Sequence, residues 1–123
     1  MREPARYSRD WWLLVAKAWN SSDQCDLLAG FGDVTFEVLD SDIPAVTLSW
    51  NKSGHALIVD GPGLETCKLS APAPRWDDFV NGKFGAAVGV LTGKIRYSGS
   101  LARLLPFPRG FDRLAEVARR AAS

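Results

Sequence analysis

Residues that bind transition metals or exchange protons near neutral pH are scarce in this sequence. The chain has two cysteines, Cys25 and Cys67, and a single histidine, His55. The cysteines do not stand in C-x-x-C spacing, and one histidine cannot complete the ligands of a zinc site. We therefore expect no metal site and no other cofactor, and we expect reduced thiols that are mostly buried.

Long apolar runs are absent as well. The longest candidate, residues 11–16, is much shorter than the roughly 20 apolar residues of a membrane-spanning helix. The first residues lack the smooth apolar stretch and the small-residue cleavage site of a secretory signal. The sequence predicts no integral membrane insertion and a cytoplasmic location.

Neither sign of charge is in excess. Fifteen basic and 14 acidic residues give a formal net charge of +1, which argues against nucleic acid as a partner. The nearest approach to a basic cluster lies toward the C-terminus: Arg103, Arg109, Arg113, Arg119 and Arg120. Acidic residues are interspersed there, so a solvated helix face is the first interpretation and transient contact with an anionic membrane is the alternative.

Apolar residues are plentiful enough for one core. Hydrophobic residues make up 46% of the 123 residues and charged residues 24%, which are ordinary values for a globular protein. A chain of this length usually folds as one compact unit. We expect a single domain over residues 1–123, as a monomer or a homodimer.

Alternation with a period of two predicts strands in the first half of the chain. The inward positions of the first two strands are Val34, Phe36, Val38, Val46, Leu48 and Trp50. Further strands are expected over residues 55–60 and 66–70, and a fifth around Ile95 and Tyr97. Because the first four strands follow one another, we predict an antiparallel meander whose open face is polar.

Helical periodicity appears before and after these strands. It predicts a helix over residues 7–20 capped by Ser8, and Ser21 with Gln24 has the spacing of a capping box for a short helix ending at Gly30. A helix after Pro74 is expected to carry Asp77 and Asp78 near its N-terminus and to stop at residues 81–82. Short helices are expected over residues 84–91 and 100–105, and an amphipathic helix ends the chain. The inward residues of the 84–91 helix and of the last helix are predicted to be Phe84, Ala87, Val88, Leu91, Phe111, Leu114, Ala115 and Ala118.

This order of elements resembles the sterol carrier protein type 2 family. The likeness rests on residues 75–105, where WDDFVNGK precedes a small helix and LTGKIRYSGSLARLL follows it. The pattern is similar to the family's helix ending in Gly, small helix, Gly-Lys-Ile, Gly-Asp and apolar helix. Ser100 stands where the family commonly has Asp, and Ser also caps helices.

The resemblance implies an α+β fold with a five-stranded, mainly antiparallel sheet covered on one face by helices. It also implies an apolar cavity between the layers that takes up sterols, fatty acyl chains or other lipids. The residues expected to line that cavity are Phe36, Leu48, Trp50, Phe79, Phe84, Val88, Leu91, Tyr97, Leu101, Leu104, Phe107 and Phe111. Most of these side chains would be ordinary core in any fold, although the aromatic ones are suggestive as a set.

Candidates for catalysis are few. His55 is the side chain whose unperturbed pKa lies near neutrality, but it is expected at an exposed strand start. Tyr97 and Asp78 form the pair that could orient a polar substrate group, and no spacing requires that they meet.

Three hypotheses about function follow from the sequence. The first is binding or transfer of an apolar small molecule, and the second is a small enzyme using the same cavity on a lipid or specialised metabolite. The third is an accessory protein docking on a partner enzyme of lipid or secondary metabolism.

Overall fold

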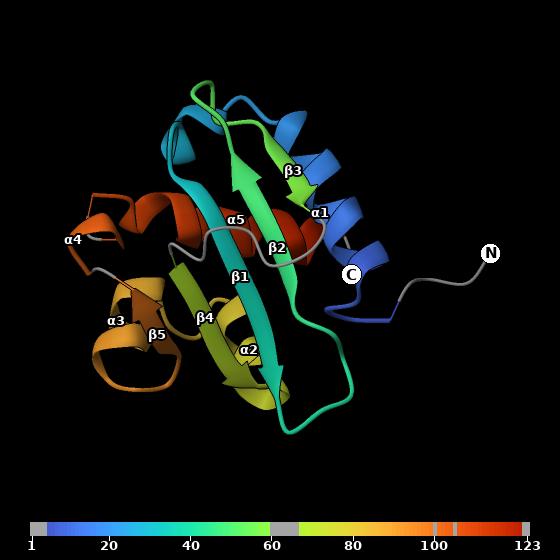
Figure 1. The fold of residues 1–123 in the computed structure, drawn as a ribbon, viewed down its shortest axis with the longest axis vertical. Helices are drawn as coiled ribbons and strands as arrows, with labels where there is room; N and C mark the ends of the chain where they lie inside the picture. Colours follow the sequence, from blue (N-terminus) through green and yellow to red (C-terminus); the bar gives the residue numbers. More distant parts are fainter. Residues whose placement is uncertain (1–4, 60–66, 100, 105, 122–123) are drawn as a thin grey trace.

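The computed structural model describes residues 5–59, 67–99, 101–104 and 106–121, which form a five-stranded sheet with helices against one face (Figure 1). The strands are β1 (Gly32–Leu39), β2 (Val46–Trp50), β3 (Ala56–Val59), β4 (Cys67–Pro72) and β5 (Arg96–Gly99). The helices are α1 (Arg9–Asn20), α2 (Ala73–Val80), α3 (Ala86–Leu91), α4 (Leu101–Leu104), α5 (Pro108–Ala121) and the short 3-10 helix η1 (Cys25–Leu28). The predicted α+β fold is confirmed.

The sheet is mixed, with strand order β3-β2-β1-β4-β5. β1 pairs antiparallel with β2 and β2 with β3, as the predicted hairpins require. β4 pairs with β1 in parallel, so the predicted meander is wrong beyond β3. Alternation decides which residues face the core but not which strand is the neighbour. β1 is the central strand, and the backbone groups on its second edge need a partner, which β4 supplies.

The core lies between the sheet and α1, α2 and α5. Trp12 of α1 stacks on Phe36 of β1 with ring centroids 4.3 Å apart. Trp50 of β2 meets Phe111 of α5 edge-on at 6.3 Å. The inward residues predicted for the last helix, Phe111, Leu114, Ala115 and Ala118, are all buried. That prediction is confirmed, because the amphipathic α5 turns its apolar stripe to the sheet.

One of the two predicted helix caps is present. Ser8 caps α1, since the Trp11 amide donates to Ser8 Oγ at 3.2 Å. The predicted capping box is wrong: Ser21 ends α1, and its hydroxyl donates back to the Lys17 carbonyl at 3.0 Å. Gln24 precedes η1 without a side-chain cap. The Ser21 hydroxyl is thus used by the helix that it ends.

α2 ends as predicted but begins earlier. Its first residue is Ala73, so Asp77 and Asp78 lie beyond the first turn and do not complement the helix N-terminus, which corrects that expectation. Asn81 is the C-cap, and Gly82 follows with φ +80°, a left-handed conformation that glycine adopts without steric cost.

α3 faces the core with different residues from those predicted. Its buried residues are Ala86 and Gly89, whereas Val88 and Leu91 are 52% and 73% exposed. A Cβ atom on Gly89 would lie 2.6 Å from Phe84 Cε2, so α3 approaches its neighbours through its smallest residue. The prediction placed the larger apolar side chains of this helix inward. In the structure the helix packs closely through the small residues on its opposite face.

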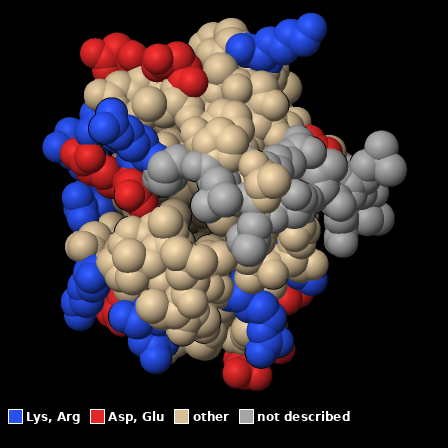
Figure 2. Space-filling model, turned by 90° about the vertical axis from the view of Figure 1, so that its left-hand side faces the viewer, with Lys and Arg blue, Asp and Glu red and all other residues tan. Residues whose placement is uncertain are grey.

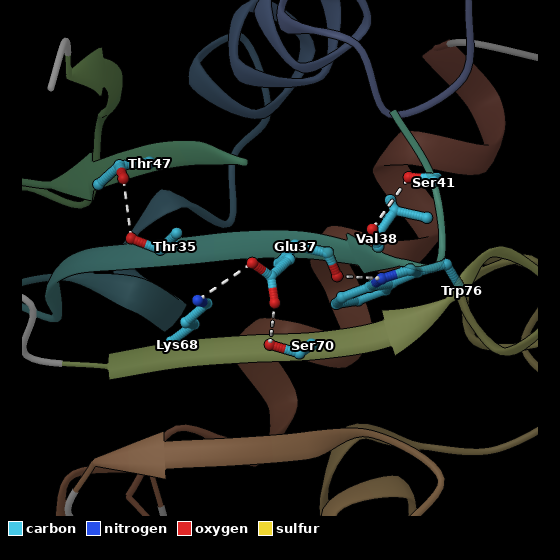
Figure 3. Close-up of polar contacts among 8 residues, drawn as sticks. All are labelled: Thr35, Glu37, Val38, Ser41, Thr47, Lys68, Ser70 and Trp76. Carbon is cyan, nitrogen blue, oxygen red and sulfur yellow. Dashed lines mark hydrogen bonds and ion pairs between the residues drawn. The ribbon is translucent and has the colours of Figure 1, made fainter. Parts of the chain in front are cut away.

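The outward face of the sheet is polar (Figure 3). Glu37 of β1 pairs with Lys68 of β4 at 3.1 Å and accepts a hydrogen bond from Ser70 at 3.3 Å. Thr35 and Thr47 hydrogen-bond across β1 and β2 at 2.8 Å. The prediction that this face is polar is confirmed at these positions. They argue against a broad apolar docking surface there.

α1 is fastened to the β2–β3 hairpin by its last two residues. The Trp19 indole donates to the Gly54 carbonyl at 2.8 Å. The Asn20 amide group makes two hydrogen bonds to Ala56, accepting from its N–H at 2.7 Å and donating to its carbonyl at 2.9 Å. Asn20 thereby pairs with the backbone at the start of the edge strand β3.

Replacing Asn20 by alanine is expected to lower the free energy of unfolding by about 1–3 kcal/mol, because both Ala56 backbone groups lose their partner. Urea denaturation measures the loss, and hydrogen exchange at the Ala56 amide should quicken with it. Ser21→Ala is the matched control, since the Ser21 hydroxyl bonds only within α1. Equal losses in the two variants would contradict the assigned role of Asn20.

Candidate functional site

Eleven of the twelve predicted cavity residues divide into three groups. Those buried in the layer between sheet and helices are Phe36, Leu48, Trp50, Phe79, Leu104 and Phe111. Phe84, Tyr97 and Phe107 are half-buried and pack against this core. Val88 and Leu91 lie on the exposed side of α3. Leu101 belongs to α4, but its side chain lies outside the described residues.

Aromatic side chains enclose a small void in that layer. The void measures about 10 Å³ and is lined by Tyr7, Trp11, Trp12, Phe36, Trp76, Phe79, Val80, Leu114, Ala115 and Ala118. A space of this size barely admits one water molecule. This part of the layer is therefore packed, and a ligand reaches it only if side chains move.

Four of these aromatic residues are missing from the predicted cavity lining: Tyr7, Trp11, Trp12 and Trp76. They come from α1, from α2 and from the residue before the Ser8 cap. The feature of the sequence that could have pointed to them is its content of five tryptophans in 123 residues. The prediction assigned only one of these tryptophans, Trp50, to the cavity. The helical spacing at positions 11 and 12 predicts side chains buried in the core, but it does not distinguish the lining of a cavity from ordinary packing.

Two indole groups in the layer have unused donors. The Nε1 atoms of Trp11 and Trp50 are buried, and neither has a hydrogen-bond partner among the described residues. Leaving a buried donor unpaired costs about 1–3 kcal/mol. An oxygen acceptor entering the layer would offset that cost.

Tyr7 closes the layer at the start of α1. Its backbone has φ +67°, its side chain is buried, and its hydroxyl donates to Asp77 Oδ1 at 2.5 Å. Arg6 also contacts Asp77, at 3.1 Å. Burial, and next the hydrogen bond to Asp77, raise the pKa of Tyr7 above its ordinary value. Tyr7 is therefore a protonated donor that anchors the N-terminal segment to α2.

The raised pKa of Tyr7 predicts a loss of stability at high pH. The folded state holds the proton more tightly than the unfolded state, so its contribution is complete below the unfolded pKa of about 10. Above that pH the contribution falls, by up to about 1.4 kcal/mol per pH unit. Urea denaturation from pH 8 to 11 should show a steeper decline for the wild type than for Tyr7→Phe. Parallel declines would contradict this assignment.

A second, larger space opens on the surface between α5 and the connection from α2 to α3. It measures about 270 Å³ and is called the α2–α5 hollow here. Its apolar lining is Phe79, Phe84 and Ala115, its charged lining is Asp112, Glu116 and Arg119, and Gly82 and Gly85 complete it. Figure 2 shows the side of the molecule that lies on the left in Figure 1. On that side, mixed basic and acidic side chains lie beside a broad uncharged surface.

The two carboxylates of the hollow already have partners. Asp112 accepts the Ala86 amide at 2.7 Å and so stabilises the start of α3. Glu116 pairs with Arg113 at 2.7 Å and with Arg120 at 2.8 Å. The hydrogen bond from Arg113 holds the pKa of Glu116 below its ordinary value, so Glu116 remains ionised.

The three candidates for catalysis lie on separate elements. His55 is exposed in the β2–β3 turn, where its Nδ1 lies 3.1 Å from Ser53 Oγ. Asp78 of α2 pairs with Lys83 at 3.4 Å. Tyr97 lies in β5 opposite Leu69. Their catalytic role stays a prediction that nothing in this arrangement tests.

Two further expectations concern metals and membranes. The described residues contain no group of three or more His, Cys, Asp or Glu side chains that could hold a metal ion. Within the same part of the chain, none of the helices has the length and apolar character needed to cross a bilayer. Cys67 is buried and Cys25 half-buried, and neither thiol takes part in a disulfide bond.

Comparison with known proteins gives matches in structure only. No protein-family model matches the sequence, and no curated protein matches it either. A crystal structure of sterol carrier protein 2 has a TM-score of 0.80 at 19% identity, over 96% of this chain and 100% of that one. A Thermus thermophilus protein described as possibly a sterol carrier protein has a TM-score of 0.78 at 18% identity, over 97% of this chain and 91% of that one.

A third match is the ubiquinone synthesis protein UbiJ-SCP2, with a TM-score of 0.62 at 14% identity, over 99% of this chain and 100% of that one. Identities this low carry the architecture but no activity or ligand. The sheet and its helical layer match over nearly the whole chain in all three cases. The chain therefore has the fold of the sterol carrier protein 2 domains, as the sequence predicted.

Proposed function

We propose that this protein binds an apolar or amphipathic small molecule in the layer between the sheet and α1, α2 and α5. The observation that carries the proposal is the concentration of aromatic side chains in that one layer, within a fold shared with sterol carrier protein 2. Aromatic walls offer large, rigid apolar surfaces to a flat or chain-like ligand. The ligand is a lipid, an acyl chain, a sterol or isoprenoid, or a polyketide-like molecule.

Burial drives binding in this proposal. At about 25 cal/mol per Å² of apolar surface removed from water, a ligand that buries about 300 Å² gains about 7.5 kcal/mol before the costs of association. The unpaired indole donors of Trp11 and Trp50 favour a ligand with an oxygen acceptor, because such an acceptor satisfies a donor that is otherwise buried alone.

Binding also requires the layer to open. The void beside Trp12 and Trp76 holds about 10 Å³, far less than any lipid. The ligand therefore selects a state in which side chains or helices have moved apart, and the rarity of that state lowers the apparent affinity. We therefore expect slow association together with an apparent affinity below that of a preformed cavity.

Native mass spectrometry of the purified protein, followed by organic extraction, tests this proposal. A stoichiometric apolar molecule released by extraction is the expected result, and its mass identifies the ligand class. Titration with a panel of acyl chains, sterols and isoprenoids covers the case in which purification strips the ligand. An empty protein that also binds no member of the panel would refute the proposal.

An accessory role is the second candidate function. The match to a ubiquinone synthesis protein and the packed interior favour it. In this role the protein docks on an enzyme of lipid or secondary metabolism, in the cytoplasm, and presents or receives the apolar molecule there. Co-purification with one stable enzyme partner, together with an empty interior, would support this role over that of a free carrier.

A further inference from the structure

Two residues are shared by the lining of the α2–α5 hollow and that of the aromatic layer. Phe79 and Ala115 line both the hollow and the interior void. The Phe79 ring lies 6.1 Å from the Phe84 ring, which lines the hollow, and 6.0 Å from the Trp76 ring, which lines the void. The three rings form a continuous aromatic path from the surface to the layer, with Phe79 in the middle.

The free space around Phe79 is unequal. The hollow on its outer side measures about 270 Å³, and the void on its inner side about 10 Å³. Close-packed interiors resist movement, so the ring can rotate outward far more readily than inward. Outward rotation would join the hollow to the layer between sheet and helices.

Arg119 is the cation among the described residues that line the hollow, and its charge acts on Glu116 without a close ion pair. No described carboxylate lies within ion-pair distance of it, and its Nη1 makes one long hydrogen bond to the Val80 carbonyl at 3.4 Å. The carboxylates of Asp112 and Glu116 are already engaged by other groups. Arg119 thus has guanidinium donors left for an anion that enters the hollow.

From this arrangement we infer the chemistry of the ligand and its route. We propose that the α2–α5 hollow is the mouth and head-group site for an amphiphile with an anionic head. Arg119 binds the head, and Phe79 gates the passage of the tail into the aromatic layer. The inference rests on the proposed function and adds the residues that give it specificity.

Head-group selection is tested with two fluorescent single-chain probes of equal length, a carboxylate and the corresponding alcohol. The wild type should prefer the carboxylate. Arg119→Gln should weaken carboxylate binding about tenfold and leave alcohol binding unchanged. Arg75→Gln is the matched control, because Arg75 of α2 is exposed and does not line the hollow. A wild type without preference, or equal effects of the two arginine variants, would overturn the role of Arg119.

The gate is tested by association rates in stopped-flow measurements. Phe79→Leu removes the ring and should speed association of both probes severalfold, whereas Ala115→Phe fills the passage from α5 and should slow it. Circular dichroism confirms that each variant is folded. Rates equal to those of the wild type in both folded variants would overturn the gate.

These outcomes separate the inference from the function on which it rests. Wild-type protein that binds neither probe and no member of the lipid panel refutes both. Binding that persists but ignores Arg119 and Phe79 refutes only the mouth and leaves the carrier function standing.

Discussion

Gly54→Ala is expected to lower the free energy of unfolding by more than about 4 kcal/mol, a large part of the roughly 5–15 kcal/mol that stabilises a typical domain. A Cβ atom at this position would lie 1.8 Å from the Cys25 carbonyl oxygen and 2.5 Å from its carbon. Both atoms belong to the backbone, so no side-chain rotation relieves the clash. The shift would also break the hydrogen bond from the Trp19 indole to the Gly54 carbonyl.

Gly93→Ala is the matched control for this prediction. Gly54 and Gly93 have φ of +87° and +78°, but nothing lies within 4 Å of a Cβ atom on Gly93. That variant therefore isolates the cost of a left-handed alanine, about 1–2 kcal/mol. Urea denaturation of both variants measures the difference. Similar losses would mean that backbone conformation, and not the close approach of η1 to the β2–β3 turn, makes Gly54 necessary.

The parts of the fold that were predictable are those encoded within a few consecutive residues. Ser8 and the apolar spacing after it predicted α1, and strict alternation predicted β1 and β2 with the correct inward side chains. The amphipathic stripe of α5 was equally local. In each case one element contains enough apolar positions for its period to be recognised without knowledge of its neighbours.

The errors come from contacts between elements that are distant in sequence. The parallel pairing of β4 with β1 depends on which edge of β1 is free after the first hairpins form. In α3 the six residues are too few for a clear period, and the contact of Gly89 with Phe84 decided the buried face. Both outcomes depend on tertiary packing that overrides local pattern.

The candidate site shows the same division. Phe36, Trp50 and Phe79 were predicted to lie in the layer, because strand and helix periods turn them inward. The charged lining of the hollow was not predicted. Asp112, Glu116 and Arg119 look like an ordinary solvated helix face in sequence, and only the packing of α5 beside residues 82–85 brings them to the same hollow as Phe84.

Trp76→Ala is expected to cost about 3–5 kcal/mol of unfolding free energy. The Trp76 ring packs against Phe36 and Phe79, each at 6.0 Å, and against Tyr7 at 6.4 Å. Its indole donates to the Glu37 carbonyl at 2.9 Å, which ties α2 to the central strand (Figure 3). Truncation removes the ring and leaves that carbonyl without its donor.

Trp76→Phe partly separates the two contributions, because it keeps a six-membered aromatic ring in the layer and loses the indole donor with the five-membered ring. We expect it to cost about 1–2 kcal/mol in urea denaturation. Losses of equal size in the two variants would mean that the hydrogen bond to Glu37, and not the packing of the ring, dominates at this position.

The alanine variant also bears on function, because the space it creates adjoins the small void of the aromatic layer. If the ligand occupies this layer, Trp76→Ala should bind a compact apolar probe more tightly than the wild type while being less stable, since the cavity no longer has to be opened. A variant that loses stability and binding together would place the ligand elsewhere. Opposite changes in stability and affinity are therefore the result that locates the ligand between the sheet and α2.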